Sequence, residues 1–162
     1  MITHDELIEI LRYEPETGDF IWLVNRGKAR EGARAGNRQS GGYLQVRIRG
    51  RNYYAHRLAF LYVHKRWPSQ HIDHINGIPY DNRIANLREA TPGQNMHNSV
   101  KPKNNTSGYK GVSLEKRTGR WRASIKVNNK IRHLGTYDTP EEAYEAYKEA
   151  AKKLHGEFAR FD

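Results

Sequence analysis

The segment Ile72-Asp73-His74-Ile75-Asn76-Gly77 decides the fold of the chain's first part, and the text after it is as informative: Asp81-Asn82-Arg83, Asn86-Leu87 and Thr91-Pro92-Gly93-Gln94-Asn95. Turn signals at Asn76-Gly77 and Asp81-Asn82 divide residues 70–90 into two short strands and their connection. Thr91 then fits an N-cap, with Pro92 at the first helical position and Gln94 at the third. These local signals predict a strand–strand–helix unit.

The polar side chains of this unit suit phosphodiester hydrolysis. A neutral histidine accepts a proton from water near pH 7, and His74 is such a group. Asp73 and Asn95 offer oxygen ligands, which hard divalent cations prefer. Adjacent side chains of a strand point to opposite faces, so Asp73 and His74 serve one site only where the strand ends and the backbone turns. The Asn76-Gly77 signal predicts a turn at that point.

Net charge points to a polyanionic partner. The chain has 162 residues, enough for one domain or two small ones, and 28 Lys and Arg against 18 Asp and Glu give it a net charge of +10. Residues 26–66 hold eleven Lys and Arg and one acid, and residues 101–135 hold ten and one. Two long tracts of one sign predict two separate contacts with a phosphate backbone.

The composition excludes several classes of protein. No stretch approaches the roughly 20 apolar residues that span a bilayer, and the N-terminus lacks the pattern of a signal peptide. The chain has no cysteine, so disulfides and thiolate zinc sites are excluded and any metal is held by oxygen or imidazole ligands. We therefore expect a cytoplasmic protein without a membrane partner or a small-molecule cofactor.

The N-terminal residues predict a small mixed fold. Thr3 and Glu6 fit a capping box that opens a helix carrying Leu7, Ile10 and Leu11. Strands are predicted at 19–23, 43–48 and 52–54, and a helix at 56–64. Residues 25–42, rich in Arg and Gly, predict a mobile basic loop.

A different pattern begins after residues 101–107, whose polar composition predicts a linker. Strands are predicted at 109–113, 121–127 and 131–137, and Thr139 with Glu142 fits a capping box that opens a helix closing near Gly156. The predicted buried face of that helix consists of Ala143, Tyr144, Ala146, Tyr147, Ala150, Ala151 and Leu154. We therefore predict an α+β protein with domains at 1–100 and 108–162, the first having its strand–strand–helix core at about 54–100.

The pattern Asp-His, Asn, Asn closely resembles the HNH nucleases with a ββα-metal finger, especially the phage and intron-encoded homing type. The neighbouring text that matches lies at 14–18 (Glu-Pro-Glu-Thr-Gly), 42–44 (Gly-Tyr-Leu), 54–59 (Tyr-Ala-His-Arg-Leu-Ala) and 81–88, so the resemblance covers residues 7–98. It implies a metal-dependent endonuclease that leaves a 3′ hydroxyl and a 5′ phosphate. Intracellular action in a phage-infected host, as a monomer, is the expectation that follows.

The resemblance also implies a role for each motif residue. His74 is the general base, and Asp73 and Asn95 hold one Mg²⁺ or another divalent cation such as Mn²⁺. Asn86 corresponds to the middle Asn, which orients the loop and the base. His56 either supports the site or is a packed core histidine.

Residues 107–161 resemble the AP2 domain through Ser107-Gly108-Tyr109-Lys110-Gly111-Val112, Gly119-Arg120-Trp121-Arg122-Ala123-Ser124-Ile125 and Leu134-Gly135-Thr136-Tyr137. Strand alternation puts Arg120, Arg122, Ser124 and Lys126 on the sheet face away from the helix. The positions that match DNA-contacting ones are Lys110, Ser113, Glu115, Arg120, Arg122, Ser124, Lys126, Ile131 and His133. Plant members usually carry Arg at 113, 115 and 131 and Trp at 133, so their recognition sequence is not carried over.

Four further cations are predicted to contact DNA: Arg47, Arg49, Arg57 and Arg132. Two other readings remain. One is a DNA-binding protein that does not cleave, with a vestigial nuclease site. The other is an RNA-directed nuclease or RNA-binding protein, but this sequence lacks the exposed aromatic residues that single-stranded RNA recognition uses.

Overall fold

The computed structural model describes residues 1–25, 27–99, 101 and 104–161, and its contacts divide the chain into two units, Met1–Ala90 and Thr91–Asp162. The division falls ten residues before the boundary expected at residue 100. Residues 91–99 group with the second unit because their helix contacts its C-terminal segment. The domain boundaries expected at residues 100 and 108 remain predictions.

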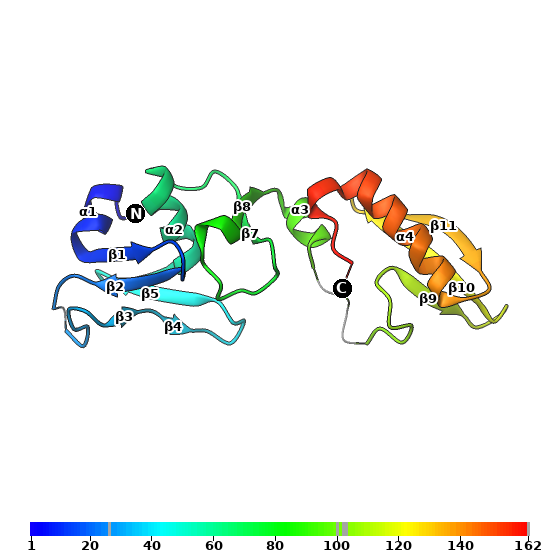
Figure 1. The fold of residues 1–162 in the computed structure, drawn as a ribbon, viewed down its shortest axis with the longest axis horizontal. Coiled ribbons are helices and arrows are strands. Elements are labelled where there is room, and N and C mark those ends of the chain that lie inside the picture. The colour runs from blue at the N-terminus through cyan, green and yellow to red at the C-terminus, as the bar shows by residue number, and fades with distance from the viewer. Residues whose placement is uncertain (26, 100, 102–103, 162) are drawn as a thin grey trace. The chain divides into compact units, whose positions relative to one another are not determined.

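The first unit opens with α1 (His4–Ile10), whose Thr3 and Glu6 form the predicted capping box. The chain then runs directly into β1 (Leu11–Glu14), which pairs antiparallel with β2 (Asp19–Trp22). The sequence pattern did not predict β1, because Leu11 fits the apolar stripe of the preceding helix, whereas it is the first residue of the strand. A third strand, β3 (Arg34–Ala35), pairs with β2 and completes this small sheet (Figure 1).

A second three-stranded sheet consists of β4 (Asn37–Arg38), β5 (Leu44–Ile48) and β6 (Arg51–Tyr54), and α2 (Ala55–His64) follows it. The prediction of an irregular loop over 25–42 is wrong for residues 34–38, which form two short strands. Each of these strands has only two residues, so no alternation of apolar side chains marks it in the sequence. Backbone pairing defines them instead: β3 pairs with β2, and β4 pairs with β5. Gly36 lies between them with φ +108°, a conformation that favours glycine.

The predicted pair of short strands is confirmed as β7 (His71–His74) and β8 (Leu87–Ala90), with the short 3₁₀ helix η1 (Ile84–Asn86) before β8. Their register puts Asp73 opposite Arg88 and His74 opposite Leu87. Both strands end in a core shared with α1, α2 and the two sheets. Its most deeply buried apolar side chains are Leu7, Leu11, Phe20, Val46, Ile48, Leu58 and Ala59.

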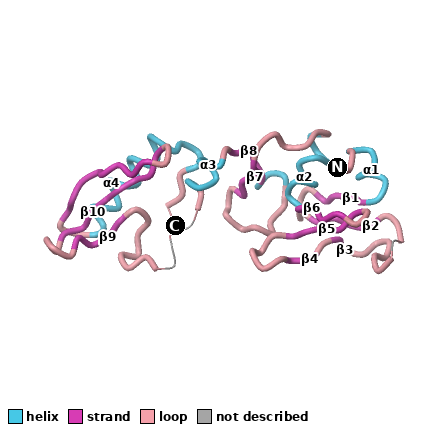
Figure 2. Tube along the Cα trace, turned by 180° about the vertical axis from the view of Figure 1, so that it is seen from behind, coloured by secondary structure: helices cyan, strands magenta, loops and turns pink. Residues whose placement is uncertain are grey.

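The second unit begins with α3 (Pro92–His97), capped by Thr91 and Gln94 as predicted. Strands β9 (Val112–Glu115), β10 (Arg120–Val127) and β11 (Lys130–Tyr137) form an antiparallel sheet in the order β11-β10-β9. The helix α4 (Pro140–His155) covers one face of that sheet, and η2 (Gly156–Phe158) follows (Figures 1 and 2). The three-stranded sheet and its helix agree with the prediction.

The buried face of α4 differs from the predicted one at its last turn. Ala143, Tyr147 and Ala151 are buried as expected, but Leu154 is exposed and His155 is buried in its place. His155 hydrogen-bonds through Nε2 to the carbonyl oxygen of Lys126, 3.2 Å away. A polar partner on β10 therefore selects which side chain of the last turn points inward.

Small antiparallel sheets and helices make the chain a mixed α and β protein in both units. Within the described residues, no helix has both the length and the apolar character needed to cross a bilayer.

The turn between β1 and β2 packs tightly on a distant part of the first unit. Gly18 has φ +78°, and a Cβ there would lie 2.5 Å from the backbone nitrogen of Arg83 and from the backbone carbon of Asn82. The Tyr13 hydroxyl donates to the Asn82 carbonyl oxygen at 2.7 Å. The first hairpin therefore supports the segment between β7 and β8.

We expect Gly18→Ala to lower the free energy of unfolding of the first unit by about 2–4 kcal/mol, because backbone strain and a steric clash add. The matched control is Gly50→Ala, at φ +80° with no heavy atom within 4 Å of the new Cβ, which costs only about 1 kcal/mol of strain. Urea unfolding in a Trp121→Phe background measures both, because the remaining Trp22 and Trp67 lie in the first unit. Equal losses in the two variants would contradict the steric explanation.

Candidate active site

Asp73 and His74 are the last two residues of β7, and both are buried, with 3% and 5% of their surface exposed. The chain turns directly after them, since the Gly77 N–H donates to the His74 carbonyl oxygen at 2.7 Å. The Ile75 N–H donates to the Asn86 carbonyl oxygen at 2.9 Å. The two side chains thus lie at a strand end, where the sequence predicted that they could serve one site.

The carboxylate of Asp73 is paired across the two-stranded ribbon. Its Oδ2 accepts hydrogen bonds from Nε and Nη2 of Arg88, each at 2.9 Å. The Arg88 side chain is itself largely buried, at 15% exposure. A buried carboxylate without such a partner is strongly destabilising, so the Arg88 guanidinium offsets the cost of burying Asp73. Sequence analysis gave Arg88 no role, because its partner follows only from the strand register.

The His74 ring is held by a second amide. Its Nε2 lies 3.3 Å from Oδ1 of Asn82, which is completely buried. Burial lowers the pKa of His74, and the Asn82 contact and the carboxylates of Asp73 and Asp81 oppose this only in part. The ring is therefore neutral near pH 7, the state in which a histidine can accept a proton.

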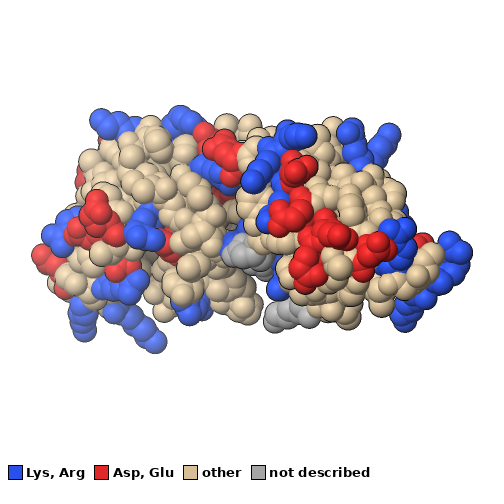
Figure 3. Space-filling view, turned by 45° about the vertical axis from the view of Figure 1, so that its right-hand side comes forward, with Lys and Arg blue, Asp and Glu red and all other residues tan. Residues whose placement is uncertain are grey.

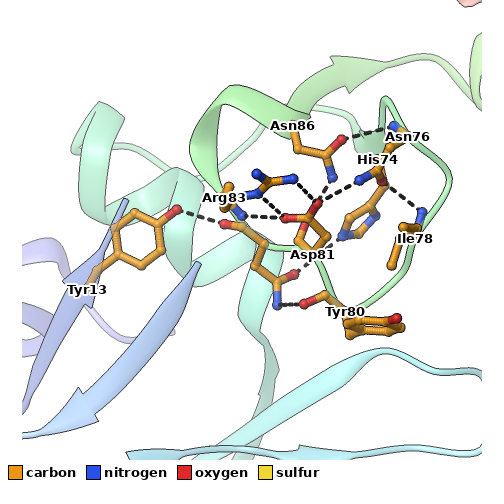
Figure 4. A network of polar contacts seen from close by, with 9 residues as sticks. Tyr13, His74, Asn76, Ile78, Tyr80, Asp81, Arg83 and Asn86 are labelled. Atoms are coloured by element: carbon orange, nitrogen blue, oxygen red, sulfur yellow. Dashed lines mark hydrogen bonds and ion pairs between the residues drawn. The ribbon is translucent and has the colours of Figure 1, made fainter. Parts of the chain in front are cut away.

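Asn86 closes the segment between the two strands. Its Oδ1 accepts from the Asn76 N–H at 2.9 Å, and its Nδ2 donates to the Asp81 carbonyl oxygen at 2.8 Å (Figure 4). One buried amide therefore fixes both ends of residues 76–81. The orienting role expected for Asn86 stays a prediction, and these two hydrogen bonds are the contacts through which it would act.

A second set of bonds stiffens the same segment at its surface. Asp81 accepts from Nδ2 of Asn76 at 2.6 Å and from Nε of Arg83 at 2.8 Å (Figure 4). The Arg83 guanidinium and, to a smaller extent, the Asn76 amide lower the pKa of Asp81 to about 2. Asp81 therefore stays charged at neutral pH, and its hydrogen bonds to Asn76 and Arg83 restrain the segment between β7 and β8.

His56, which the sequence left either as a support of the site or as a packed core histidine, is buried beside His74. Its ring is perpendicular to that of His74 with centroids 5.1 Å apart, and it stacks on Tyr54 at 5.3 Å. Burial, with smaller contributions from His74 and Arg57, lowers the pKa of His56 to about 3. His56 is therefore a neutral, buried neighbour of His74.

Asn95 lies on α3 in the second unit, whereas Asp73 and His74 lie in the first. Lys110 anchors the end of α3, because its Nζ donates to the carbonyl oxygens of His97 at 2.8 Å and Ser99 at 2.6 Å. The rings of His97 and His155 stack at 3.6 Å. Lys110, predicted to contact DNA, thus has carbonyl partners within its own unit.

The donor chemistry of Asp73 and Asn95 fits a hard cation, since carboxylate and amide oxygens are the ligands that Mg²⁺ and Mn²⁺ accept. Within the described ranges, no group of three or more His, Asp or Glu side chains forms a metal cage.

The sheet of the second unit presents the predicted side chains on its exposed face. Arg120, Arg122 and Lys126 are exposed, whereas Ala123 and Ile125 between them are buried under α4. The register adds His133 opposite Ser124 and Ile131 opposite Lys126, with Ser113 and Glu115 of β9 opposite Arg122 and Arg120.

Two polar contacts order this face: Arg122 Nε donates to His133 Nδ1 at 3.1 Å, and Arg120 pairs with Asp138 at 2.9 Å. Arg132 lies opposite Ile125, which puts it on the helix side of the sheet, away from the other predicted DNA contacts.

Basic side chains also line an open pocket of about 800 Å³ in the first unit. Its cations come from three segments that the fold brings together: Lys28, Arg30, Arg34, Arg47 and Arg49. Arg34 pairs with Asp19 and Arg49 with Glu6. Arg57 lies outside this pocket and donates to the carbonyl oxygens of Pro68 and Gln70, at 3.4 and 3.3 Å.

Figure 3 shows the charged side chains on one face of the protein. Acidic side chains form bands on this face, and Lys and Arg side chains lie beside them and at the edges of the view.

Two family models match the chain. The HNH endonuclease model matches residues 53–97, a range that holds Asp73, His74, Asn86 and Asn95, and the AP2 domain model matches residues 107–157. The class is therefore that of proteins joining an HNH domain to an AP2 domain, and both domains indicate DNA binding.

Curated relatives agree with this class. Protein 3.8 of Escherichia phage T7 is 40% identical over 91 residues, which are 56% of this chain and 74% of the relative. The chain belongs to the HNH endonuclease family, with an AP2 domain after the HNH domain.

Other relatives share less of their length. A mimivirus protein named uncharacterized HNH endonuclease L560 (Acanthamoeba polyphaga mimivirus) is 34% identical over 106 residues, 64% of this chain and 54% of the relative. The AP2-like ethylene-responsive transcription factor AIL7 of Arabidopsis thaliana is 36% identical over 90 residues, 54% of this chain but only 16% of the relative. No solved structure matches the chain.

Burial of His56 predicts a dependence of stability on pH. The unfolded chain takes up a proton at His56 below about pH 6.5, whereas the folded chain resists protonation until about pH 3. The free energy of unfolding should therefore fall by about 2 kcal/mol between pH 8 and pH 5, above the range in which carboxylates titrate. In His56→Phe, which keeps an aromatic ring on Tyr54, this part of the pH dependence should vanish. An unchanged pH dependence in that variant would refute the assignment.

The contacts of Lys110 predict that it serves α3 and not the DNA backbone. We expect Lys126→Gln to reduce by about one the slope of log affinity for duplex DNA against log salt, since a phosphate contact is lost. Lys110→Gln should leave that slope unchanged and lower the stability of the second unit. Fluorescence anisotropy at several salt concentrations measures the slopes, and an equal reduction in both variants would contradict this division.

Proposed function

We propose that the chain is a divalent-metal-dependent endonuclease of the HNH homing type that cuts double-stranded DNA near a site its AP2 domain helps to select. The observation that carries this proposal is the buried end of β7, where the His74 ring follows Asp73, whose carboxylate pairs with Arg88, and the next segment is fixed by Asn86. Membership of the HNH family supports the reaction class.

In the proposed reaction His74 is the general base. It takes a proton from the attacking water as the water oxygen bonds to the scissile phosphorus. The bond from phosphorus to the 3′ oxygen then breaks, which leaves a 3′ hydroxyl and a 5′ phosphate. Because burial lowers the pKa of His74, the base is available at neutral pH without prior deprotonation.

Asp73 and Asn95 would hold one divalent cation, Mg²⁺ or Mn²⁺. When bound, such an ion supplies charge stabilisation to the scissile phosphate and the leaving oxygen. Arg88 orients the Asp73 carboxylate through its two bonds to Oδ2. Asn95 is the amide ligand of this proposal and lies on α3.

Two basic surfaces would hold the substrate. The exposed sheet face of Arg120, Arg122, Ser124, Lys126 and His133 suits contacts with base edges and phosphates in the major groove. The pocket that includes Lys28, Arg30 and Arg47 in the first unit suits a phosphate backbone, which is read without sequence preference. Cutting by a monomer in a phage-infected cell is part of the same proposal.

Cleavage of plasmid DNA tests the proposal. His74→Ala should lower the rate about 10²–10⁴-fold, the usual contribution of a general base, while affinity for duplex DNA is retained. The matched control is His71→Ala, an exposed histidine of the same strand, which should cut at the rate of the unaltered chain. EDTA should stop cutting, and Asn95→Ala should raise the Mg²⁺ concentration needed for half-maximal activity.

Tight binding of DNA without cutting, with Mg²⁺ and with Mn²⁺ and on several substrates, would overturn the proposal. That outcome would favour a DNA-binding protein with a vestigial nuclease site. Stronger binding to single-stranded RNA than to duplex DNA would favour the RNA-directed alternative.

A further inference from the structure

Asn82 is the most deeply buried polar side chain of the first unit, and the sequence motif gave it no role. None of its surface is exposed, and its backbone carbonyl oxygen accepts from the Tyr13 hydroxyl at 2.7 Å. The backbone atoms of Gly18 lie directly against it, since any Cβ at residue 18 would clash there. The backbone of Asn82 is therefore fixed by the first hairpin.

The two ends of the Asn82 side-chain amide have different partners. Its Nδ2 donates to the Tyr80 carbonyl oxygen at 3.2 Å, and its Oδ1 lies 3.3 Å from Nε2 of His74 (Figure 4). A backbone carbonyl oxygen can only accept, so the NH₂ end of the amide has to face Tyr80. The oxygen end therefore has to face His74.

This orientation determines where His74 carries its proton. The amide oxygen also only accepts, so a hydrogen bond to it requires a proton on Nε2 of the ring. A neutral imidazole has one such proton, and the other nitrogen, Nδ1, is then the basic one. The contact with Asn82 thus selects one of the two tautomers.

We propose that Asn82 is a positioning residue that fixes His74 in the Nε2–H tautomer and so makes Nδ1 the atom that accepts a proton. The catalytic consequence rests on the proposed function of His74, whereas the tautomer itself does not. Asn82 acts through His74 and need not touch substrate. Its amide also sets the rotation of the ring, because the bond to Oδ1 restrains Nε2 in one direction.

The test is nuclear magnetic resonance of the full chain with ¹⁵N-labelled histidine, without DNA or metal, at about pH 8 where histidine is neutral. His74 is assigned among the eight histidines by the signal lost in His74→Gln. We expect ring ¹⁵N shifts of a protonated Nε2 and an unprotonated Nδ1. The opposite pattern would overturn the inference even if the chain cuts DNA, and the expected pattern would support it even if the chain does not.

Three variants separate positioning from mere stability. Asn82→Asp keeps an oxygen acceptor and should keep the Nε2–H signal, whereas Asn82→Leu removes the acceptor and should give a mixed or solvent-exchanging signal. Tyr13→Phe removes the hydroxyl bond to the Asn82 backbone, so it should lower stability and leave the His74 ring shifts unchanged. Ring shifts in Asn82→Leu identical to those of the unaltered chain, in a folded sample, would overturn the inference.

Cleavage kinetics give a second readout for the same variants. Loss of a residue that orients a catalytic group costs about 10- to 100-fold in activity. Asn82→Leu should show this loss in kcat with KM for DNA unchanged, and Asn82→Asp should restore most of it. A loss confined to KM, or no rescue by Asn82→Asp, would contradict a role in positioning the base.

Discussion

The two hydrogen bonds of the buried Asn86 amide are the constraint on which the proposed site depends. They hold the Asn76 N–H and the Asp81 carbonyl oxygen, the two ends of the segment that joins β7 to β8. Each buried polar group left without a hydrogen-bond partner costs about 1–3 kcal/mol. Loss of the two Asn86 bonds would leave the Asn76 N–H and the Asp81 carbonyl oxygen without this partner at the same time. Closure at Asn86 keeps Asn82 in reach of His74, and the β7–β8 register then puts Arg88 on Asp73.

Support for this polar cluster comes from outside the segment that matches the HNH family. The match begins at residue 53, yet the Tyr13 hydroxyl and the close approach of Gly18 both act on Asn82. The first hairpin and its sheet therefore do more than enlarge a small core. They supply the rigid surface against which residues 80–83 pack, and a polar active site inside a unit of this size needs such a surface to keep its geometry.

Much of the architecture follows from local signals in the sequence. The capping boxes at Thr91 and Thr139 predicted where α3 and α4 begin, and alternation along β10 predicted its exposed face. The strand β1 was missed because Leu11 was counted with the preceding helix, and β3 and β4 were missed because each has only two residues, too few to show an alternating pattern. In the site, His74 and Asp73 carry a motif, whereas their partners Asn82 and Arg88 are defined only by tertiary contacts. The same reason explains why His155, not Leu154, is buried at the end of α4.

The helix α3, which carries Asn95, is anchored by contacts within the second unit. Asn95, a proposed metal ligand, lies on a helix whose end is held by Lys110 and whose His97 stacks on His155. Both anchors belong to the second unit, which also carries the sheet of β9, β10 and β11. A helix of six residues has little stability of its own, so its orientation is set by these contacts. The orientation of Asn95 therefore depends on contacts made within the second unit, whereas Asn82 and His74 are held by contacts within the first.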